Sequence, residues 1–328
     1  MCPIRLKKPQ NKRHGNGFTI LEVLVATTVL TLLLAIMLAV MNQTSSTVMC
    51  ASAKIDAFAT ARSTFDIIVG KLSQATLNTY WDYDDPSLPR HYLRKSDLQF
   101  LTRANTQYPG YGQEIFFQVP ESYSSNANYQ GTEGILNACG YFVRYSNDDN
   151  FRPGVVNNKR WRYRLMEAIQ PTEEMQVFRL AANDDTAWAT NISMTNAIPL
   201  CENVIALIVW PRLSAGADVT GTQLTSNYQY DSQKNANSYP QPITANQLPP
   251  TVQVTLVVID DASAVRLDTH SDTPPQVIYN ALQNKFTDVT KYQQDLSSLA
   301  SILTTHRIKY QIRNISVVLQ ESKWSSTP

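Results

Sequence analysis

Apolar and polar positions divide the chain into a long apolar stretch near its start and a polar remainder. Residues 23–41 form a run of nineteen that only Thr27, Thr28 and Thr31 interrupt. A helix of this length rises about 28 Å, which is close to the thickness of the hydrocarbon core of a bilayer. Nothing later in the chain is comparable, so the pattern predicts a single membrane-spanning helix near the N-terminus.

Behind this stretch the pattern becomes amphipathic. Apolar residues recur at spacings of four and three, which places them on one face of a helix. They are Ala61, Phe65, Ile68, Leu72 and Ala75. No proline interrupts residues 10–85. We therefore expect one helix from Phe18 to about Leu77, roughly 90 Å long, which ends before the acidic and proline-rich residues 82–89.

Beyond residue 89, short runs of aromatic and β-branched residues alternate with turn-forming residues, which is typical of strands. We predict strands at residues 98–102, 114–119, 140–145, 160–165, 204–210, 252–259 and 307–319. Residues 287–304 have helical periodicity instead. The alternation in the last strand changes phase, so we expect a bulge near Arg313 or Asn314. The predicted fold class is α+β: a long helix packed on an antiparallel sheet.

Residues 221–250 differ from the rest in composition. Nine of these thirty residues are Asn or Gln, and charged residues are few. Such a stretch buries little apolar area, so we predict an exposed loop that with its flanks covers about 211–250. A contact surface is the alternative, and a mobile insertion is favoured.

The charge of the chain is concentrated at its start. The 328 residues carry 28 basic and 27 acidic side chains, a net charge of +1, but residues 1–17 hold five basic residues and no acid. The remainder therefore holds 23 basic against 27 acidic side chains, a net charge of −4. By the positive-inside rule, we expect residues 1–17 to stay in the cytoplasm and the chain from about residue 42 to be translocated.

Glu22 is the only Asp, Glu, Lys or Arg between residues 14 and 53. A carboxylate at the edge of the hydrocarbon is costly and is normally paired or functional. A cleaved secretory signal is disfavoured, because its apolar segment would carry no charge and the small residues 51–53 lie too far downstream. A lipoprotein is disfavoured because the bulky Met49 precedes Cys50. A plain signal anchor remains an alternative, although it gives no reason for Glu22.

Residues 15–26, with the sequence GNGFTILEVLVA, closely resemble the class III signal of type IV pilins and type II secretion pseudopilins. The resemblance implies that a prepilin peptidase cuts between Gly17 and Phe18 and methylates the new amine of Phe18. It also implies that Glu22, the fifth mature residue, faces the N-terminal amine of a neighbouring subunit. A buried carboxylate and a buried ammonium each become tolerable when they pair.

These observations predict four segments. Residues 1–17 are a removed leader, 18–41 are the transmembrane part of the helix, 42–80 are its periplasmic amphipathic part, and 81–328 are a globular α+β head. The resemblance implies the lollipop shape of the pilin family. It also implies other pilins and inner-membrane lipid as partners.

A further resemblance covers much of the chain. Residues 72–83, 92–98 and 171–177 look like the C-type protein of the Verru_Chthon cassette family, whose members are pilin-like and of uncharacterised role. The architecture is also similar to the J-type minor pseudopilins and the W-type minor pilins. These resemblances imply a structural class and little chemistry.

The sequence offers no catalytic site. His91, His270 and His306 lie in neither an HExxH nor a GxSxG frame, and no glycine-rich phosphate-binding loop occurs. We therefore expect no enzymatic activity and no cofactor. Acidic pairs could hold calcium, but none has EF-hand spacing, and structural roles are favoured. They are Asp82 with Asp84 and Asp85, Asp148 with Asp149, Asp184 with Asp185, and Asp260 with Asp261.

Arg160, Arg162 and Arg164 alternate along one predicted strand and so share a face. A basic stripe can attract nucleic acid. However, the aromatic residues of this strand point to the opposite face, and the chain without its leader is acidic. We therefore expect no nucleic-acid partner and a solvated sheet face.

Three cysteines remain after the leader is removed, so at most one internal disulfide can form in an oxidising compartment. Cys139 with Cys201 is favoured, because Cys50 lies on the long helix near the membrane. The spacing alone leaves the pairing open.

The sequence therefore predicts a minor pilin-like structural subunit in the inner membrane, with its head in the periplasm. After processing it would assemble as a tip or initiation subunit of a pilus or a type II secretion filament. A signal-anchored binding or sensory domain that never assembles is the alternative. The sequence does not separate a pilus from a secretion system.

Overall fold

The computed structural model describes residues 19–105, 112–179, 186–195, 197–214 and 216–324, and it divides the chain into two units, residues 1–52 and 53–328. The helix α1 (Ile20–Ser73) contributes to both. Over residues 20–49 the apolar side chains of this helix are all exposed. Ile20–Met49 is long and apolar enough to cross a membrane, and none of its most apolar window is buried inside the chain.

In the second unit, α1 presents a buried stripe. Ala61, Phe65, Ile68 and Leu72 are each at most 5% exposed, and Ala75 is buried just after the helix ends. These are the residues that the 4-3-4-3 spacing selected, so the predicted amphipathic face is confirmed. They share one core with the sheets described next.

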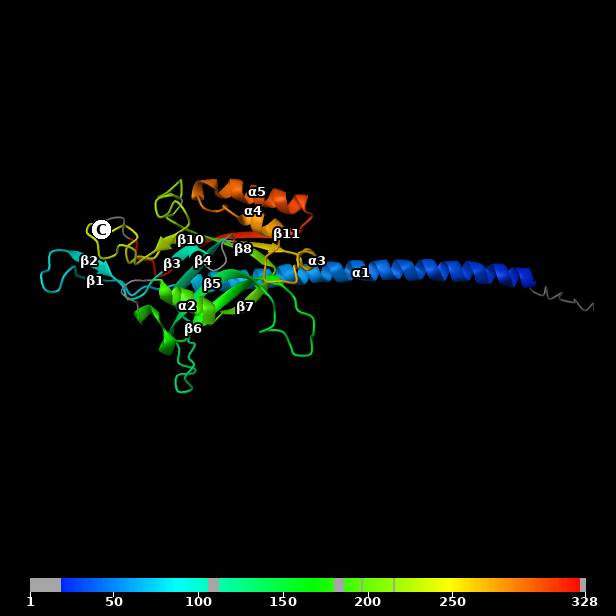
Figure 1. The fold of residues 1–328 in the computed structure, drawn as a ribbon, viewed down its shortest axis with the longest axis horizontal. Helices are drawn as coiled ribbons and strands as arrows, with labels where there is room; N and C mark the ends of the chain where they lie inside the picture. The colour runs from blue at the N-terminus through cyan, green and yellow to red at the C-terminus, as the bar shows by residue number, and fades with distance from the viewer. Residues whose placement is uncertain (1–18, 106–111, 180–185, 196, 215, 325–328) are drawn as a thin grey trace, which may run out of the picture. The chain divides into compact units, whose positions relative to one another are not determined.

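Two antiparallel sheets form the body of this unit (Figure 1). The larger has the order β7-β6-β5-β4-β3-β9, and the smaller has the order β11-β10-β8. The bounds are β3 (Leu101–Ala104), β4 (Gln113–Pro120), β5 (Leu136–Ser146), β6 (Arg162–Gln170), β7 (Ala197–Glu202), β8 (Val204–Arg212), β9 (Tyr230–Asp231), β10 (Thr251–Ile259) and β11 (Tyr310–Val318). A separate hairpin pairs β1 (Tyr80–Tyr83) with β2 (Tyr92–Lys95). The predicted α+β class, with a long helix and an antiparallel sheet, is confirmed.

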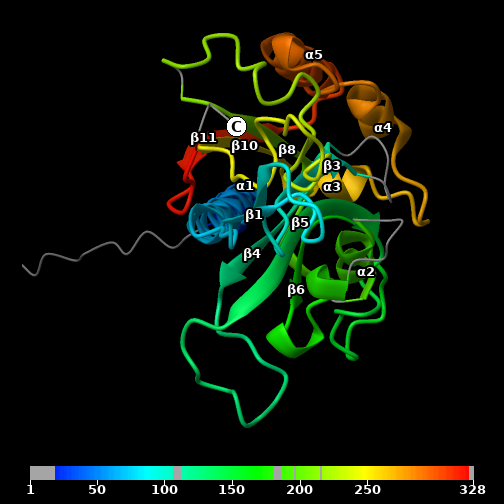
Figure 2. The same ribbon diagram turned by 90° about the vertical axis from the view of Figure 1, so that its left-hand side faces the viewer.

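Short helices complete the unit. They are α2 (Ala187–Thr195), α3 (Asp261–Arg266), α4 (Gln276–Leu282) and α5 (Tyr292–Thr305), with 3₁₀ turns η1 (Thr172–Glu174), η2 (Val177–Arg179) and η3 (Val289–Lys291). Side chains alternate between the faces of a strand. Phe117 of β4 therefore joins the core that contains α1, while Phe116 joins a second core with Trp188 of α2. The larger sheet is thus covered on both faces, as Figure 2 shows.

A partly buried ionic cluster ties α1 to the larger sheet. Lys71 Nζ contacts Glu121 and lies 2.9 Å from Glu167 Oε1, which also accepts a 2.6 Å hydrogen bond from Tyr141. Burial by itself lowers the pKa of Lys71, but the hydrogen bonds to Glu121 and Glu167 outweigh it, so the pKa lies above its ordinary value. The cluster fixes the last turn of α1.

The predicted bulge near Arg313 or Asn314 is wrong. The pairing of β10 with β11 continues without a shift from Ile259 opposite Tyr310 to Thr251 opposite Val318. The apolar residues change phase because the two faces of this edge strand are buried at different ends of the strand. Tyr310 and Ile312 are half-buried on one face, and Val317 is buried on the other.

The segment 211–250 is largely irregular, as predicted, but it is not an exposed loop. Tyr228 and Tyr230 are buried, and β9 within this segment extends the larger sheet. The prediction failed because Asn and Gln side chains can replace backbone hydrogen-bond partners inside a protein. Gln241 accepts from Arg94 N at 2.8 Å and donates to Arg94 O at 2.8 Å, in the way a neighbouring strand would.

Candidate functional site

The candidate site is the start of α1. Gly17 and Phe18, the predicted cleavage position, lie outside the described residues. Thr19 and Glu22 are described, and they contact each other in both directions. Thr19 Oγ1 accepts a 3.2 Å hydrogen bond from Glu22 N, and Glu22 Oε2 accepts from Thr19 N and from Thr19 Oγ1, both at 3.3 Å. Because α1 begins at Ile20, Thr19 is its N-cap and Glu22 is its third residue, which is the geometry of a capping box.

This cap gives Glu22 a local role that our interpretation of the sequence missed. The spacing Ser/Thr-x-x-Glu before an apolar run is a signal of a helix start, and residues 19–22 read T-I-L-E. The helix N-terminus carries partial positive charge, so a carboxylate there is favourable. The cap holds the carboxylate beside the backbone nitrogen that is bonded to residue 18. The helix itself therefore holds Glu22 against Thr19, the residue that follows the predicted cleavage position and Phe18 in the sequence.

The next turns of α1 present an apolar surface in which the threonine hydroxyls are hydrogen-bonded within the helix. Thr27, Thr28 and Thr31 each donate a hydroxyl hydrogen bond to a carbonyl three residues earlier, at 2.8–3.0 Å. Internal hydrogen bonds of this kind make a hydroxyl tolerable in hydrocarbon. A helix that is apolar all round requires lipid or other helices around it. The first unit is therefore suited to anchoring the chain in a membrane.

The stripe of Arg160, Arg162 and Arg164, of which the last two lie on β6, is not the solvated face that we predicted. Arg162 and Arg164 are 4% and 1% exposed. Arg162 Nη1 lies 3.0 Å from Asp268 Oδ2, and Arg164 donates to Glu202 and to the Ser146 carbonyl. The prediction used only the alternation of side chains within one strand. In the structure, neighbouring segments cover this face and provide the carboxylates and carbonyls to which the arginines bond. Arg160 alone of the three is half exposed.

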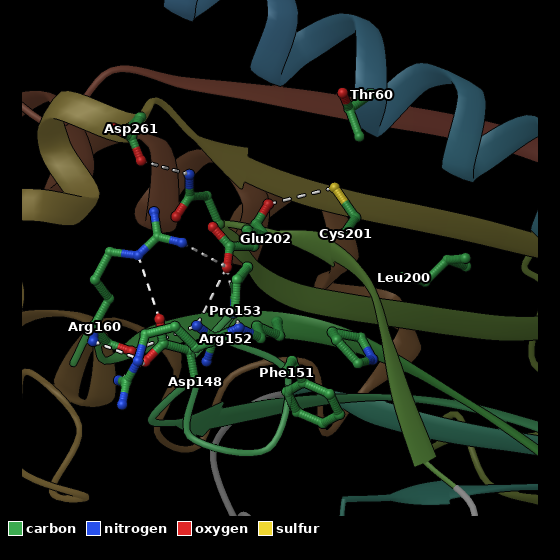
Figure 3. Close-up of a pocket in the computed structure, with 13 residues that line it drawn as sticks. Thr60, Asp148, Phe151, Arg152, Pro153, Arg160, Leu200, Cys201, Glu202 and Asp261 are labelled. Carbon is green, nitrogen blue, oxygen red and sulfur yellow. Dashed lines mark hydrogen bonds and ion pairs between the residues drawn. The ribbon is translucent and has the colours of Figure 1, made fainter. Parts of the chain in front are cut away.

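Arg160 and Arg164 line a cavity of about 460 Å³ (Figure 3). Acidic side chains face them. Arg160 Nε lies 3.4 Å from Asp148 Oδ2, and Arg164 Nη2 lies 3.2 Å from Glu202 Oε1. Arg152 from the same rim also pairs with Asp148, at 2.9 Å. The cavity therefore holds paired charges of both signs rather than a basic surface for phosphate groups.

The predicted disulfide between Cys139 and Cys201 is not formed, and both thiols are free and buried. β6 lies between their strands, with Cys139 opposite Ile169 and Cys201 opposite Leu165. Two strand spacings alone separate them by about 10 Å, beyond the roughly 7 Å limit between bridged Cα atoms. Burial raises the pKa of Cys201 to about 11 and that of Cys139 further, which suits inert core thiols.

The acidic pairs serve as caps and ion-pair partners. Asp84 accepts from Arg90 N at 2.9 Å and lies 3.0 Å from His91, contacts that hold its pKa well below the usual range. Asp148 and Asp149 pair with basic residues, and Asp260 caps α3. Asp184 and Asp185 lie outside the described residues. Within the described part of the chain, no group of three His, Cys, Asp or Glu residues is arranged to hold a metal ion.

The histidines lie in separate places. His91 stacks on Tyr239, His270 lies 3.3 Å from Asp268, and His306 follows the last residue of α5. The described contacts bring none of them to a serine or cysteine nucleophile.

Comparison with known proteins supports the interpretation of the N-terminus. Residues 12–38 match the family model of the prokaryotic N-terminal methylation motif. No curated protein and no solved structure matches the chain. The motif belongs to structural rather than enzymatic proteins and implies processing by a prepilin peptidase. The chain therefore carries the class III signal of a type IV pilin-like precursor.

Proposed function

We propose that this protein is a minor pilin-like subunit that is cut between Gly17 and Phe18, N-methylated on Phe18 and assembled into a filament. The methylation motif at residues 12–38 is the observation that carries the proposal. Two structural features support it. Glu22 is held at the start of α1, and the apolar Ile20–Met49 has no partner within the described chain.

In the proposed mechanism, the apolar part of α1 moves from the lipid bilayer into a bundle of helices from other subunits. Before assembly, lipid surrounds residues 20–49, with the basic leader in the cytoplasm and residues 53–328 in the periplasm. In the filament, the corresponding helices of other subunits replace the lipid. The Glu22 carboxylate then pairs with the Phe18 amine of a neighbour, which sets the register because an unpaired buried charge is strongly unfavourable.

We further propose that the subunit acts at the tip or at initiation. The head of residues 81–328 is too bulky to occupy every position of a closely packed filament. The similarity of the architecture to the J-type minor pseudopilins and the W-type minor pilins agrees with this proposal, and the resemblance to the C-type protein of the Verru_Chthon cassette family adds a structural class without a known role. A copy number equal to that of the major subunit in purified filaments would refute this part of the proposal.

The first experiment tests processing. The full chain is expressed with and without a prepilin peptidase, and the mature N-terminus is determined by mass spectrometry. We expect a chain that begins at N-methylated Phe18 only when the peptidase is present. Retention of the leader would instead favour a signal-anchored binding or sensory domain that does not assemble. A start near Lys54 would indicate a cleaved secretory signal, and it would also overturn the proposal.

The second experiment separates the two roles of Glu22. Gln can replace Glu in a capping box, but it carries no charge. Glu22→Gln therefore keeps the cap and removes the pairing charge, while Glu22→Val removes both. We expect both variants to be cleaved normally and both to be absent from filaments. Normal incorporation of Glu22→Gln would show that capping, and not pairing with an amine, is the role of this residue.

A further inference from the structure

The hairpin β1–β2, whose place in the fold is seen in Figures 1 and 2, carries several exposed aromatic side chains. Trp81 is 56% exposed, Tyr83 40% and Tyr92 60%, and Tyr239 of the segment 211–250 is 64% exposed. Large aromatic side chains that gather on a surface are typical of binding sites. This hairpin follows the end of α1 in the sequence.

Several of these side chains border a groove of about 320 Å³, which we call the aromatic groove. Its lining residues are Trp81, His91, Tyr92, Leu93, Tyr239, Pro240 and Gln241. The rings of His91 and Tyr239 stack with centroids 3.7 Å apart, and those of Tyr83 and Tyr92 lie 4.5 Å apart. Cavities of about 410 and 200 Å³ also border the hairpin. The hairpin is therefore bordered by three cavities.

The groove is held in place from below by Arg94. This residue is 3% exposed, and its guanidinium donates to the carbonyls of Ala245 and Pro242 at 3.2 and 3.3 Å. It lies 5.9 Å from the ring centroid of Trp81. Trp81 nevertheless stays 56% exposed, so much of the indole is open to solvent. A site that is fixed before binding loses less entropy on binding.

The amide and imidazole groups that line the groove are already used. Gln241 accepts from Arg94 N and donates to the carbonyls of Arg94 and Ala236. His91 Nδ1 contacts Asp84. A peptide backbone would need such groups as hydrogen-bond partners. The groove offers instead aromatic faces and tyrosine hydroxyls. The Tyr92 hydroxyl donates to that of Tyr83 at 2.7 Å, so Tyr92 can still accept a hydrogen bond and Tyr83 can still donate one. Such groups suit a ligand with an apolar face and a rim of hydroxyl groups.

The charge of the hairpin is balanced. Residues 80–95 contain three acidic side chains, at positions 82, 84 and 85, and three basic ones, at positions 90, 94 and 95. Proteins that stack nucleic-acid bases on aromatic rings also need a positive groove for the phosphates. The absence of net positive charge disfavours an anionic ligand here.

From these observations we propose that the aromatic groove binds a neutral oligosaccharide. The apolar face of a pyranose ring stacks on Trp81, and its hydroxyl groups bond to the tyrosine hydroxyls around it. This inference goes beyond the proposed function and does not depend on it, because the residues that line the groove take no part in the proposed processing or in the pairing of Glu22.

The test is titration calorimetry of the full chain in a detergent without a sugar headgroup, since a glycoside detergent would compete. The probes are cellohexaose, maltohexaose and chitohexaose, each up to millimolar concentration. We expect saturable binding of at least one. Trp81→Ala should weaken that binding about tenfold or more, and Tyr239→Ala should weaken it less. Binding of none of the three probes would overturn the proposal.

Tyr129→Ala is the matched control, because Tyr129 is 53% exposed on the β4–β5 loop, outside the aromatic groove. It should bind as the unaltered chain does, and all variants should keep the same thermal transition. Equal binding by Trp81→Ala and the unaltered chain would contradict the proposal. Hexaproline tests the peptide alternative, and binding of hexaproline in place of the sugars would also overturn the proposal.

Discussion

Residues 20–49 and residues 58–73 of α1 belong to one helix but differ in where their apolar side chains find partners. In the first stretch the apolar residues surround the helix, and none is buried within the chain. In the second they form one stripe that the two sheets cover. The difference shows that the chain completes its own core only from about Ala61 onward. The first stretch depends on surroundings that other molecules supply.

The largest expected effect separates the two stretches by matched substitutions. Leu72→Ala leaves a cavity in the core and should lower the free energy of unfolding by about 3 kcal/mol, while Leu33→Ala should change it by less than about 0.5 kcal/mol. Leu72 is fully buried and Leu33 is 56% exposed. Guanidinium unfolding in micelles, followed by tryptophan fluorescence, measures this, because all five tryptophans lie in residues 53–328. Equal losses of unfolding free energy in the two variants would show that the two stretches do not differ in how they contribute to the core.

Lys71→Met tests the ionic cluster that attaches the second stretch to the sheet. It leaves Glu167, whose side chain is 7% exposed, without its cation, and we expect a loss of about 2 kcal/mol. The pKa of Lys71 is raised on folding, so its contribution is present below the ordinary value of 10.5 and is lost as the pH rises through the folded value.

Unfolding curves of the unaltered chain and Lys71→Met at several pH values check this expectation. The gap in stability should stay constant from pH 7 to about 10 and close at higher pH. Glu167→Gln added to Lys71→Met should recover part of the loss. A gap that does not depend on pH up to 12 would show that the lysine stabilises through packing alone.

A smaller effect is expected at the start of the first stretch. Thr19→Val removes the N-cap and should cost about 1 kcal/mol locally, whereas Thr19→Ser keeps the hydroxyl. Hydrogen exchange followed by mass spectrometry should show roughly fivefold faster exchange in the first turn of α1 for the valine variant only. The tryptophan transition of residues 53–328 should not move. Protection that is unchanged in Thr19→Val would mean that this cap does not hold the helix start.

The smallest effect is expected for Thr28→Val. The Thr28 hydroxyl donates to Val25 O at 2.8 Å, so it is satisfied within its own helix. The substitution preserves shape, and we expect no measurable change in helix protection or in incorporation into filaments. Loss of incorporation would show that this hydroxyl bonds between helices, and the first stretch would then recognise its partners by more than its apolar surface.

Sequence periodicity predicted the parts of this fold that depend on local pattern. The stripe on α1 was found because Phe65 and Leu72 recur at helical spacing. The strands β4, β5, β8 and β10 were found because runs of aromatic and β-branched residues mark them. The capping box at Thr19 and Glu22 could also have been recognised, since its spacing is a known start signal.

The remaining features depend on contacts between distant residues. Arg162 is buried because Asp268, 106 residues away, meets it, and no pattern within β6 reveals that partner. Cys139 and Cys201 stay apart because β6 lies between them. Polar composition at residues 221–250 predicted exposure, but the side chain of Gln241 bonds to β2, far away in the sequence.

The packing of residues 221–250 determines where the protein can carry a tag. An epitope or fluorescent label inserted beside Gln241 would separate the Asn and Gln side chains from the backbone that they support, and the head would lose part of its larger sheet at β9. Residues 125–134 are exposed throughout and connect β4 to β5. Imaging of this subunit in cells should therefore use residues 125–134 as the insertion point.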